Sequence, residues 1–379
     1  MEIVSDVPLE IVDAIFYNLQ HDLRSVRSIC LISRRFWNDF RKVLYRRIAL
    51  SDNDDVLFNC FIVGSEKRTP FFTTLSTHNP SLARLLHTFL FDFSRFTASN
   101  EDIDLVSKSL SSCLKLLSNV TDLSILSSPH PIVLGDCALL RSCTFQLQAF
   151  RWISIESVSA TDLYEFLTMQ KQLQRLTFIA ERLSGSLPLP NTCCPELRDL
   201  FAGGQLIQRL LPNRSITHLG STPGIPREIR IGPEMRQKLE EIHTFRISGI
   251  PGTALLSCLG PLTSCLRSLQ IVHIVGVTVP DILRKNQAVV MALPTLKIFI
   301  QSLPNRPNFL LPRSEPKNYQ TSYGVLFEEW FDALKNLQVA YVQGYARSNG
   351  HKCYLAWKRD APDPIWVEAA EIWDISPWI

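Results

Sequence analysis

Apolar residues between positions 7 and 50 recur at the spacing of a helix face. The groups that show this spacing are Ile11, Ile15 and Leu19, then Val26, Ile29 and Cys30, and then Phe36, Phe40, Val43 and Leu44. Pro8 suits the first turn of a helix, and Asp22 and Ser33 are suited to cap the starts of the next two. The pattern predicts three short amphipathic helices with too little apolar surface for a core of their own. We therefore expect this module to dock on another surface.

Beyond residue 80 a short phrase, apolar-x-x-apolar-x-apolar, recurs along the chain. Its copies are Leu86/Phe89/Phe91, Val120/Leu123/Ile125, Leu147/Phe150/Trp152, Leu173/Leu176/Phe178, Ile242/Phe245/Ile247, Leu266/Leu269/Ile271, Leu293/Leu296/Ile298 and Leu334/Leu337/Val339, with weaker copies at Leu197/Leu200 and Ile216/Leu219. Most of the middle positions lie 24 to 27 residues apart. Segments with helical spacing separate the phrases at residues 100–117, 161–169, 233–242, 281–291 and 325–336. Helix and strand are therefore expected to alternate.

Each unit of this kind is too small to bury its apolar side alone, so neighbouring units must stack. The predicted fold class is α/β, with a parallel sheet lining one face and helices covering the other. An ordinary α/β domain with evenly spaced strands stays open as the alternative. In each strand, the residue between the second and third apolar positions is expected to face solvent on the concave side. These residues are Ser124, Arg151, Thr177, Phe201, Gly220, Arg246, Gln270, Lys297 and Gln338.

Three cations stand in this row, Arg151, Arg246 and Lys297, together with one aromatic residue, Phe201, that we expect to be exposed. Guanidinium and ammonium groups among polar neighbours suit an acidic or phosphorylated peptide, which they would hold through charge-assisted hydrogen bonds. A solvated face that binds no specific ligand is the alternative. If the row binds a target, Thr177, Phe201, Gln270 and Gln338 are expected to contribute beside the cations.

Two loops rich in Pro and Gly, residues 220–233 and 303–322, interrupt the repeat. Insertions in such arrays commonly map to one face, so these loops are candidate functional segments. Tolerated surface insertions without a role explain them equally well. The segment from residue 351 onward is rich in Trp, and we expect it to cap the apolar end of the array.

Composition narrows the class of protein. The 379 residues are 46% hydrophobic and 20% charged, which is ample for one large core or two domains. The net charge of +3 comes from scattered basic residues, which argues against a nucleic-acid partner. No signal segment and no apolar run long enough for a membrane span is found, so we expect a cytosolic or nuclear protein.

Chemistry-bearing motifs are missing from the sequence. The ten cysteines form no CxxC pair and no zinc set, and in a chain without an export signal they are expected to be buried, reduced thiols. GxSxG, P-loop, GxGxxG and HExxH motifs are also missing. We therefore predict no metal, no cofactor and no catalytic activity.

The start of the chain, VPLEIVDAIFYNL followed by DLRSVRSICLISRRFW, resembles the F-box, the adaptor-binding motif of SCF ubiquitin ligases. Pro8, Glu10 and Ile11 stand where that family opens with LPxEI, although Val7 replaces its leucine and Leu31 a usual polar residue. The resemblance implies docking on a Skp-type adaptor through Pro8, Leu9, Ile11, Ile15, Leu19, Leu23, Val26, Ile29, Cys30 and Phe36. A generic three-helix cap is the alternative.

The repeats resemble a leucine-rich repeat solenoid, but the Asn or Cys that the family places after each phrase is missing. Without that ladder of side-chain amides the turns need other hydrogen-bond partners and should be irregular. Together the two resemblances imply an F-box at residues 1–50, a solenoid at 51–350 and a cap at 351–379.

These resemblances imply a non-catalytic substrate receptor of an SCF-type ligase, linked through the adaptor to a cullin. Two alternatives stay open. One is a scaffold with the same two parts but no role in degradation. The other is a small-molecule enzyme or receptor in which the two Pro/Gly loops form a lid.

Overall fold

The computed structural model describes most of the chain. The described residues are 11, 23–32, 34–51, 60–64, 67–92, 100–126, 137–154, 157–180, 182–185, 189–222, 230–248, 259–276, 280–303, 316–343, 353–361, 363–368 and 371–372. The chain divides into two compact units, the first made of Met1–Gln174 and Phe178–Pro195, the second of Arg175–Thr177 and Glu196–Ile379. The borders after residues 50 and 350 stay predictions.

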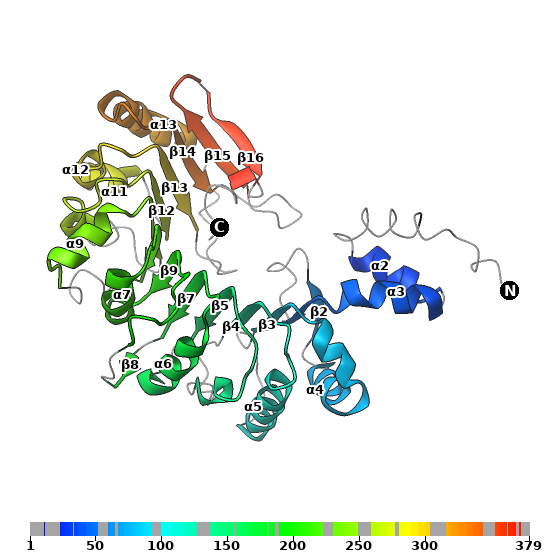
Figure 1. Ribbon diagram of the computed structural model, residues 1–379. Coiled ribbons are helices and arrows are strands. Elements are labelled where there is room, and N and C mark those ends of the chain that lie inside the picture. The colour runs from blue at the N-terminus through cyan, green and yellow to red at the C-terminus, as the bar shows by residue number, and fades with distance from the viewer. Residues whose placement is uncertain are drawn as a thin grey trace. The chain divides into compact units, whose positions relative to one another are not determined.

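The first unit combines helices with a parallel sheet. Its strands, in pairing order, are β2 (Phe61–Val63), β1 (Arg47–Leu50), β3 (Thr88–Asp92), β4 (Asp122–Leu126) and β5 (Ala149–Ile153). A separate small sheet pairs β6 (Ser157–Ser159) with β8 (Arg182–Ser184). The helical segments are α2 (Leu23–Cys30), α3 (Arg34–Leu44), α4 (Arg68–Thr73), η3 (Thr74–His78), η4 (Pro80–Leu85), α5 (Asn100–Leu114), η5 (Cys137–Leu140) and α6 (Ala160–Met169). Figure 1 shows α5 and α6 on the same side of β3, β4 and β5.

The second unit repeats this arrangement and ends in an antiparallel ribbon. Parallel pairing joins β9 (Asp199–Ala202), β10 (His218–Ser221), β11 (Thr244–Ser248), β12 (Ile271–Val275), β13 (Ile298–Ser302) and β14 (Val339–Gln343) in that order. Antiparallel pairing then adds β15 (Cys353–Lys358) and β16 (Ile365–Glu368). Strand β7 (Arg175–Ile179) is divided between the two units.

Helices and short turns connect the strands of the second unit. They are α7 (Gly204–Leu210), η6 (Leu211–Asn213), α9 (Pro233–Glu240), η7 (Gly260–Leu262), α11 (Pro280–Lys285), α12 (Gln287–Met291) and α13 (Pro316–Ala333). In Figure 1, α9, α11, α12 and α13 lie along one side of their strands. The predicted α/β class with a mostly parallel sheet is therefore confirmed.

Local sequence signals account for the helix starts that the structure describes. The Ser159 hydroxyl caps α6 by accepting a hydrogen bond from the Asp162 amide at 3.5 Å, and α9 begins with Pro233 after Gly232. Two predicted boundaries were wrong. Residues 281–291 form two helices rather than one, and α13 begins at Pro316, so that residues 316–322 are helical instead of part of a loop.

The apolar phrases supply the core. The residues of β4, β5 and β11 that belong to a phrase are at most 1% exposed: Leu123, Ile125, Phe150, Trp152, Phe245 and Ile247. Successive residues of a strand point to opposite faces, so a phrase with this spacing buries one face of every strand. Each such side chain contributes roughly 1.5–3 kcal/mol through its removal from water.

Buried glutamines bond several backbone groups between the strands. Gln170 is fully buried, and its side-chain oxygen accepts from the Leu147 amide at 2.8 Å while its amide donates to the Phe145 carbonyl at 3.4 Å. In the second unit, the Gln343 side chain accepts from the Leu303 amide at 2.8 Å. A buried backbone group requires a hydrogen-bond partner, and these glutamines supply some of the partners that an Asn ladder would otherwise supply.

Candidate functional site

The helix pair α2 and α3 has a small core of its own. Val26 and Cys30 of α2 are buried with Phe40 and Leu44 of α3, and Ile29, Phe36, Trp37, Val43, Tyr45 and Phe61 pack against them while staying partly exposed. The rings of Phe36 and Phe40 meet edge to face with their centres 5.9 Å apart. Val26 and Cys30 therefore support the module from inside, whereas Ile29 and Phe36 keep surface that a partner can reach.

Five other residues of the predicted adaptor surface have side chains outside the described part of the structure. They are Pro8, Leu9, Ile15 and Leu19, which lie wholly outside it, and Leu23, whose backbone begins α2. Ile11 is described and is 51% exposed.

Two exposed residues beside the helix pair were missed as candidates. Leu31 and Ile32 follow the end of α2 and are 79% and 64% exposed. A signal was present in the sequence, because Leu31 stands where the F-box family usually has a polar residue. A contiguous exposed apolar patch, rather than a single exposed residue, marks a surface that another molecule covers, and Leu31 and Ile32 are adjacent in the sequence.

The sheet register corrects the predicted row of concave residues. Arg246 pairs with His273, His273 with Ile300, and Ile300 with Tyr341. Gln270, Lys297 and Gln338 stand just before β12, β13 and β14, three residues ahead of the row. At β12 and β14 the reason is an overlap of two apolar phrases. Leu269, Val272 and Ile274 form the phrase that pairs with β11, not Leu266, Leu269 and Ile271.

From here on, the term row residues means the strand residues that pair in register with Arg151 in the first unit and with Arg246 in the second. In the first unit they are Ile62, Ala49, Leu90, Ser124 and Arg151. In the second unit they are Phe201, Gly220, Arg246, His273, Ile300, Tyr341, Ala356 and Ile365. Thr177 lies on β7 between two buried residues and is half-buried.

Arg151 keeps its predicted place and is exposed. The surrounding protein desolvates its guanidinium, which lowers the pKa of Arg151, while the carboxylates of Asp122 and Asp92 act in the opposite direction. Because an arginine starts from a very high pKa, the side chain keeps its charge at neutral pH. The position offers a cation on the strand face with two acids near it.

Arg246 has an aromatic support that the sequence did not predict. Phe201 is 3% exposed, so the expectation of an exposed aromatic ring was wrong. Its ring lies over Gly220, where an added Cβ would approach the ring to 2.2 Å, and the Arg246 guanidinium carbon lies 5.3 Å from the ring centre. The glycine makes room for the ring, and the ring supports the half-buried guanidinium by a cation–π contact.

A buried polar chain follows on the same face. The His273 ring nitrogen Nε2 lies 2.8 Å from the Ser302 hydroxyl, which lies 2.8 Å from the Tyr354 hydroxyl. Burial raises the pKa of Tyr354 to about 12, against the opposing effects of the Ser302 hydrogen bond and the charge of Arg246. Ile300, Tyr354 and Ile372 form a buried apolar cluster next to this chain. The chain's own later residues therefore cover this part of the row.

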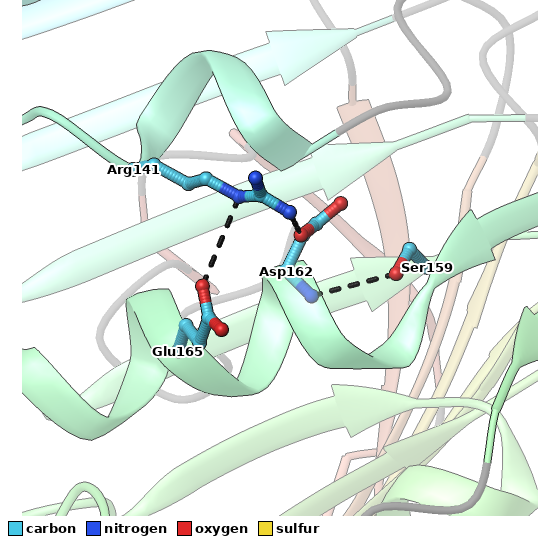
Figure 2. Close-up of polar contacts among 4 residues, drawn as sticks. All are labelled: Arg141, Ser159, Asp162 and Glu165. Carbon is cyan, nitrogen blue, oxygen red and sulfur yellow. Dashed lines mark hydrogen bonds and ion pairs between the residues drawn. The ribbon is translucent and has the colours of Figure 1, made fainter.

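A depression of about 510 Å³ lies on the first unit beside α6. Arg141, just after η5, pairs with the buried carboxylate of Asp162 and lies 3.7 Å from a Glu165 oxygen. Figure 2 shows the guanidinium between these two carboxylates, with the Ser159 cap at the helix start. The cluster joins η5 to the first turns of α6, and we assign it to stability rather than to binding.

Where the pKa of a described cysteine is shifted, burial raises it. Of the nine cysteines in the described ranges, none is in a disulfide bond, and all but the half-buried Cys60 are buried. Burial raises the pKa of Cys113 and of Cys143 to about 12, which keeps these thiols protonated and weakly nucleophilic. Over the described ranges, no group of three His, Cys, Asp or Glu residues is placed to hold a metal ion.

A scan against protein-family models and a search of curated proteins each find no match to this chain. Among the helices in the described part of the chain, none combines the length and apolar content that a membrane span requires.

Proposed function

We propose that this chain is a substrate-recognition subunit of an SCF-type cullin-RING ubiquitin ligase. In this proposal the helices near its start form an F-box that docks on a Skp-type adaptor. The repeats act as an irregular leucine-rich repeat solenoid that holds a target protein. The chain positions its target and has no catalytic role.

The exposure of Leu31 and Ile32 is the observation that carries the adaptor part of this proposal. Both are large apolar residues next to a helix pair whose buried core consists of Val26, Cys30, Phe40 and Leu44. Covering each of them would contribute roughly 1.5–3 kcal/mol. The apolar surface supports docking, and the resemblance of residues 7–36 to the F-box identifies the partner class.

The strand register and the burial of the row residues support a target surface with fewer residues than the full row. Arg151 is exposed and Arg246 is half-buried over Phe201, so these two cations are accessible on their strand faces. Each of the two guanidinium groups, taken by itself, suits an acidic or phosphorylated segment of a target through charge-assisted hydrogen bonds.

The adaptor part is tested by replacing Leu31 and Ile32 together with Asp in the full-length chain. Binding of a purified Skp-type adaptor should weaken by about a hundredfold, because two buried apolar contacts are lost and two charges are introduced. Biolayer interferometry measures the affinity. Leu105→Asp is the matched control, since Leu105 of α5 is 55% exposed and apolar but lies outside the helix pair.

The control should bind the adaptor as the parent does, and both variants should unfold at the parent's temperature. Equal adaptor binding by the double variant and the parent would remove the docking proposal. A further arm adds the cullin to the adaptor-bound chain. Assembly of the three proteins supports the ligase role, whereas adaptor binding that excludes the cullin favours the non-degradative scaffold.

A further inference from the structure

The last strand of the second unit has an open edge. Strand β16 pairs with β15 on one side only, and within the described residues no strand pairs with its other side. Every second backbone N–H and C=O of such an edge points outward and can bond to a further strand. The Glu368 amide already donates outward, to the Glu371 carboxylate at 3.2 Å.

The edge also carries exposed apolar side chains. Ile365 is 45% exposed and Trp366 is 47% exposed, although both belong to a paired strand. Trp366 lies opposite Leu355, which is 3% exposed, so the two paired residues differ sharply in their access to water. Leu355 belongs to β15, which has a strand on each side, and an added strand would give β16 a second neighbour in the same way.

Acidic residues surround this edge. Residues 360–379 contain Asp360, Asp363, Glu368, Glu371 and Asp374 and no Lys or Arg, and the first four are exposed. Among the described residues, the cations that precede β16 most closely in the sequence are Lys358, which is exposed, and Arg359, whose guanidinium donates to the carbonyl oxygens of Leu337 and Leu334. Because side chains alternate along a strand, Glu368 and Trp366 share one face.

Two other occupants fit less well. A second copy of this chain would bring the same acidic edge against itself, and like charges facing each other across strands are unfavourable. The segment of residues 373–379, WDISPWI, carries an acid and a proline, which cannot donate a hydrogen bond to a sheet.

We propose that the outer edge of β16 receives an extended basic segment of a protein partner as an added strand. Main-chain hydrogen bonds supply the pairing, and side chains supply the specificity. The matching segment carries Lys or Arg opposite Glu368 and, two residues away on the same face, an aliphatic side chain or Arg against the Trp366 ring. This edge shares no residue with the adaptor surface or with Arg151 and Arg246, the two cations of the proposed target surface, so its failure would leave the proposed function intact.

A fluorescent peptide of about seven residues, the usual length of a strand, tests the proposal on the full-length chain. The peptide alternates Arg with Val, so that Arg side chains on one face meet both Glu368 and Trp366, and anisotropy measures its dissociation constant. One comparison peptide has Glu in place of the cations, and another keeps the cations but carries N-methyl groups on alternate amides. Both should bind at least about tenfold more weakly, the first through charge and the second through lost strand pairing.

Two variants of the chain locate the site. Trp366→Ala and Glu368→Lys should each raise the dissociation constant by about tenfold, as expected for an anchor residue and a paired charge. Glu196→Lys makes the same charge change at an exposed residue outside β16 and should leave the constant within about twofold of the parent's.

Several outcomes would overturn this proposal. Equal binding of the N-methylated and unmodified peptides would mean that general charge attraction, rather than strand pairing, holds the peptide. Parent-like binding by both β16 variants would place the site elsewhere. Sedimentation showing a dimer that Trp366→Ala dissolves would make a second copy the occupant, and tighter binding of a peptide of residues 373–379 would make it the chain's own end.

Discussion

The row residue of β5 in the first unit and those of β12 and β13 in the second unit meet different surroundings. Arg151 on β5 is exposed, whereas His273 on β12 and Ile300 on β13 are fully buried. The difference comes from the chain itself, because Ile372 and Tyr354 pack against Ile300. A repeat fixes the direction in which a side chain points, but a segment from elsewhere in the sequence decides whether it stays accessible. This narrows the proposed target surface to the open positions.

Removing the cover from the buried row residues should produce the largest effect on stability. Ile372 is 1% exposed, so Ile372→Asp should lower the free energy of unfolding by about 1.5–3 kcal/mol through lost apolar burial. Urea unfolding followed by fluorescence measures the loss. Leu105→Asp, at a residue that is 55% exposed, serves as the control and should change stability by less than about 0.5 kcal/mol. If the two substitutions cost the same, the cover contributes nothing and the contrast between the two row segments disappears.

Much of the α/β arrangement was predictable because apolar spacing is set by local geometry. A strand that buries one face needs apolar residues at every second position, and the phrases around Leu123, Phe150 and Phe245 meet this need without ambiguity. Around β12 the chain satisfies two overlapping phrases, Leu266/Leu269/Ile271 and Leu269/Val272/Ile274. Only the hydrogen-bonded partner strand distinguishes the two registers, and a single sequence does not contain that information.

The candidate surfaces were less predictable than the sheet. Phe201 was expected to be exposed because its position faces the concave side, but Gly220 on the next strand leaves room for the ring to lie flat. The exposure of Leu31 was missed because an apolar residue in a helical pattern reads as core. The environment of Phe201 depends on Gly220, which is not its neighbour in the sequence. The exposure of Leu31 likewise depends on whether residues from elsewhere in the chain pack against it.

An intermediate effect is expected from the hydroxyl at the end of the buried polar chain. Tyr354→Phe removes the 2.8 Å contact with Ser302 while keeping the ring, and should lower the free energy of unfolding by about 1 kcal/mol at neutral pH. Ser302 retains its contact with His273. Chemical denaturation of the two proteins under identical conditions measures the difference, and an unchanged value would mean that the hydroxyl is not paired as described.

The same substitution should change how stability depends on pH. Burial raises the pKa of Tyr354 from 10.0 to about 12 in the folded chain, so the unfolded chain loses this proton first. The stabilisation from the neutral phenol is therefore complete below pH 10.0 and is lost as the pH rises to about 12. Phe does not titrate, so the stability advantage of the parent should shrink across this range. A constant advantage over the same pH range would contradict the assigned burial of the hydroxyl.

The smallest effect on stability, and the clearest effect on binding, is expected from the open row position. Arg151→Glu alters an exposed side chain near Asp122 and Asp92 and should lower the free energy of unfolding by less than about 1 kcal/mol, because exposed charge pairs contribute little. It should nevertheless remove partners that cross-link to the full-length chain through an acidic segment, because it replaces an attracting charge with a repelling one. Lys297→Glu is the matched control, since Lys297 is equally a cation and exposed but precedes β13 and lies outside the row. Quantitative mass spectrometry of cross-linked partners compares the two variants. Loss of the same partners from both would show that net charge, rather than the row, selects the target, since the two substitutions share only their charge.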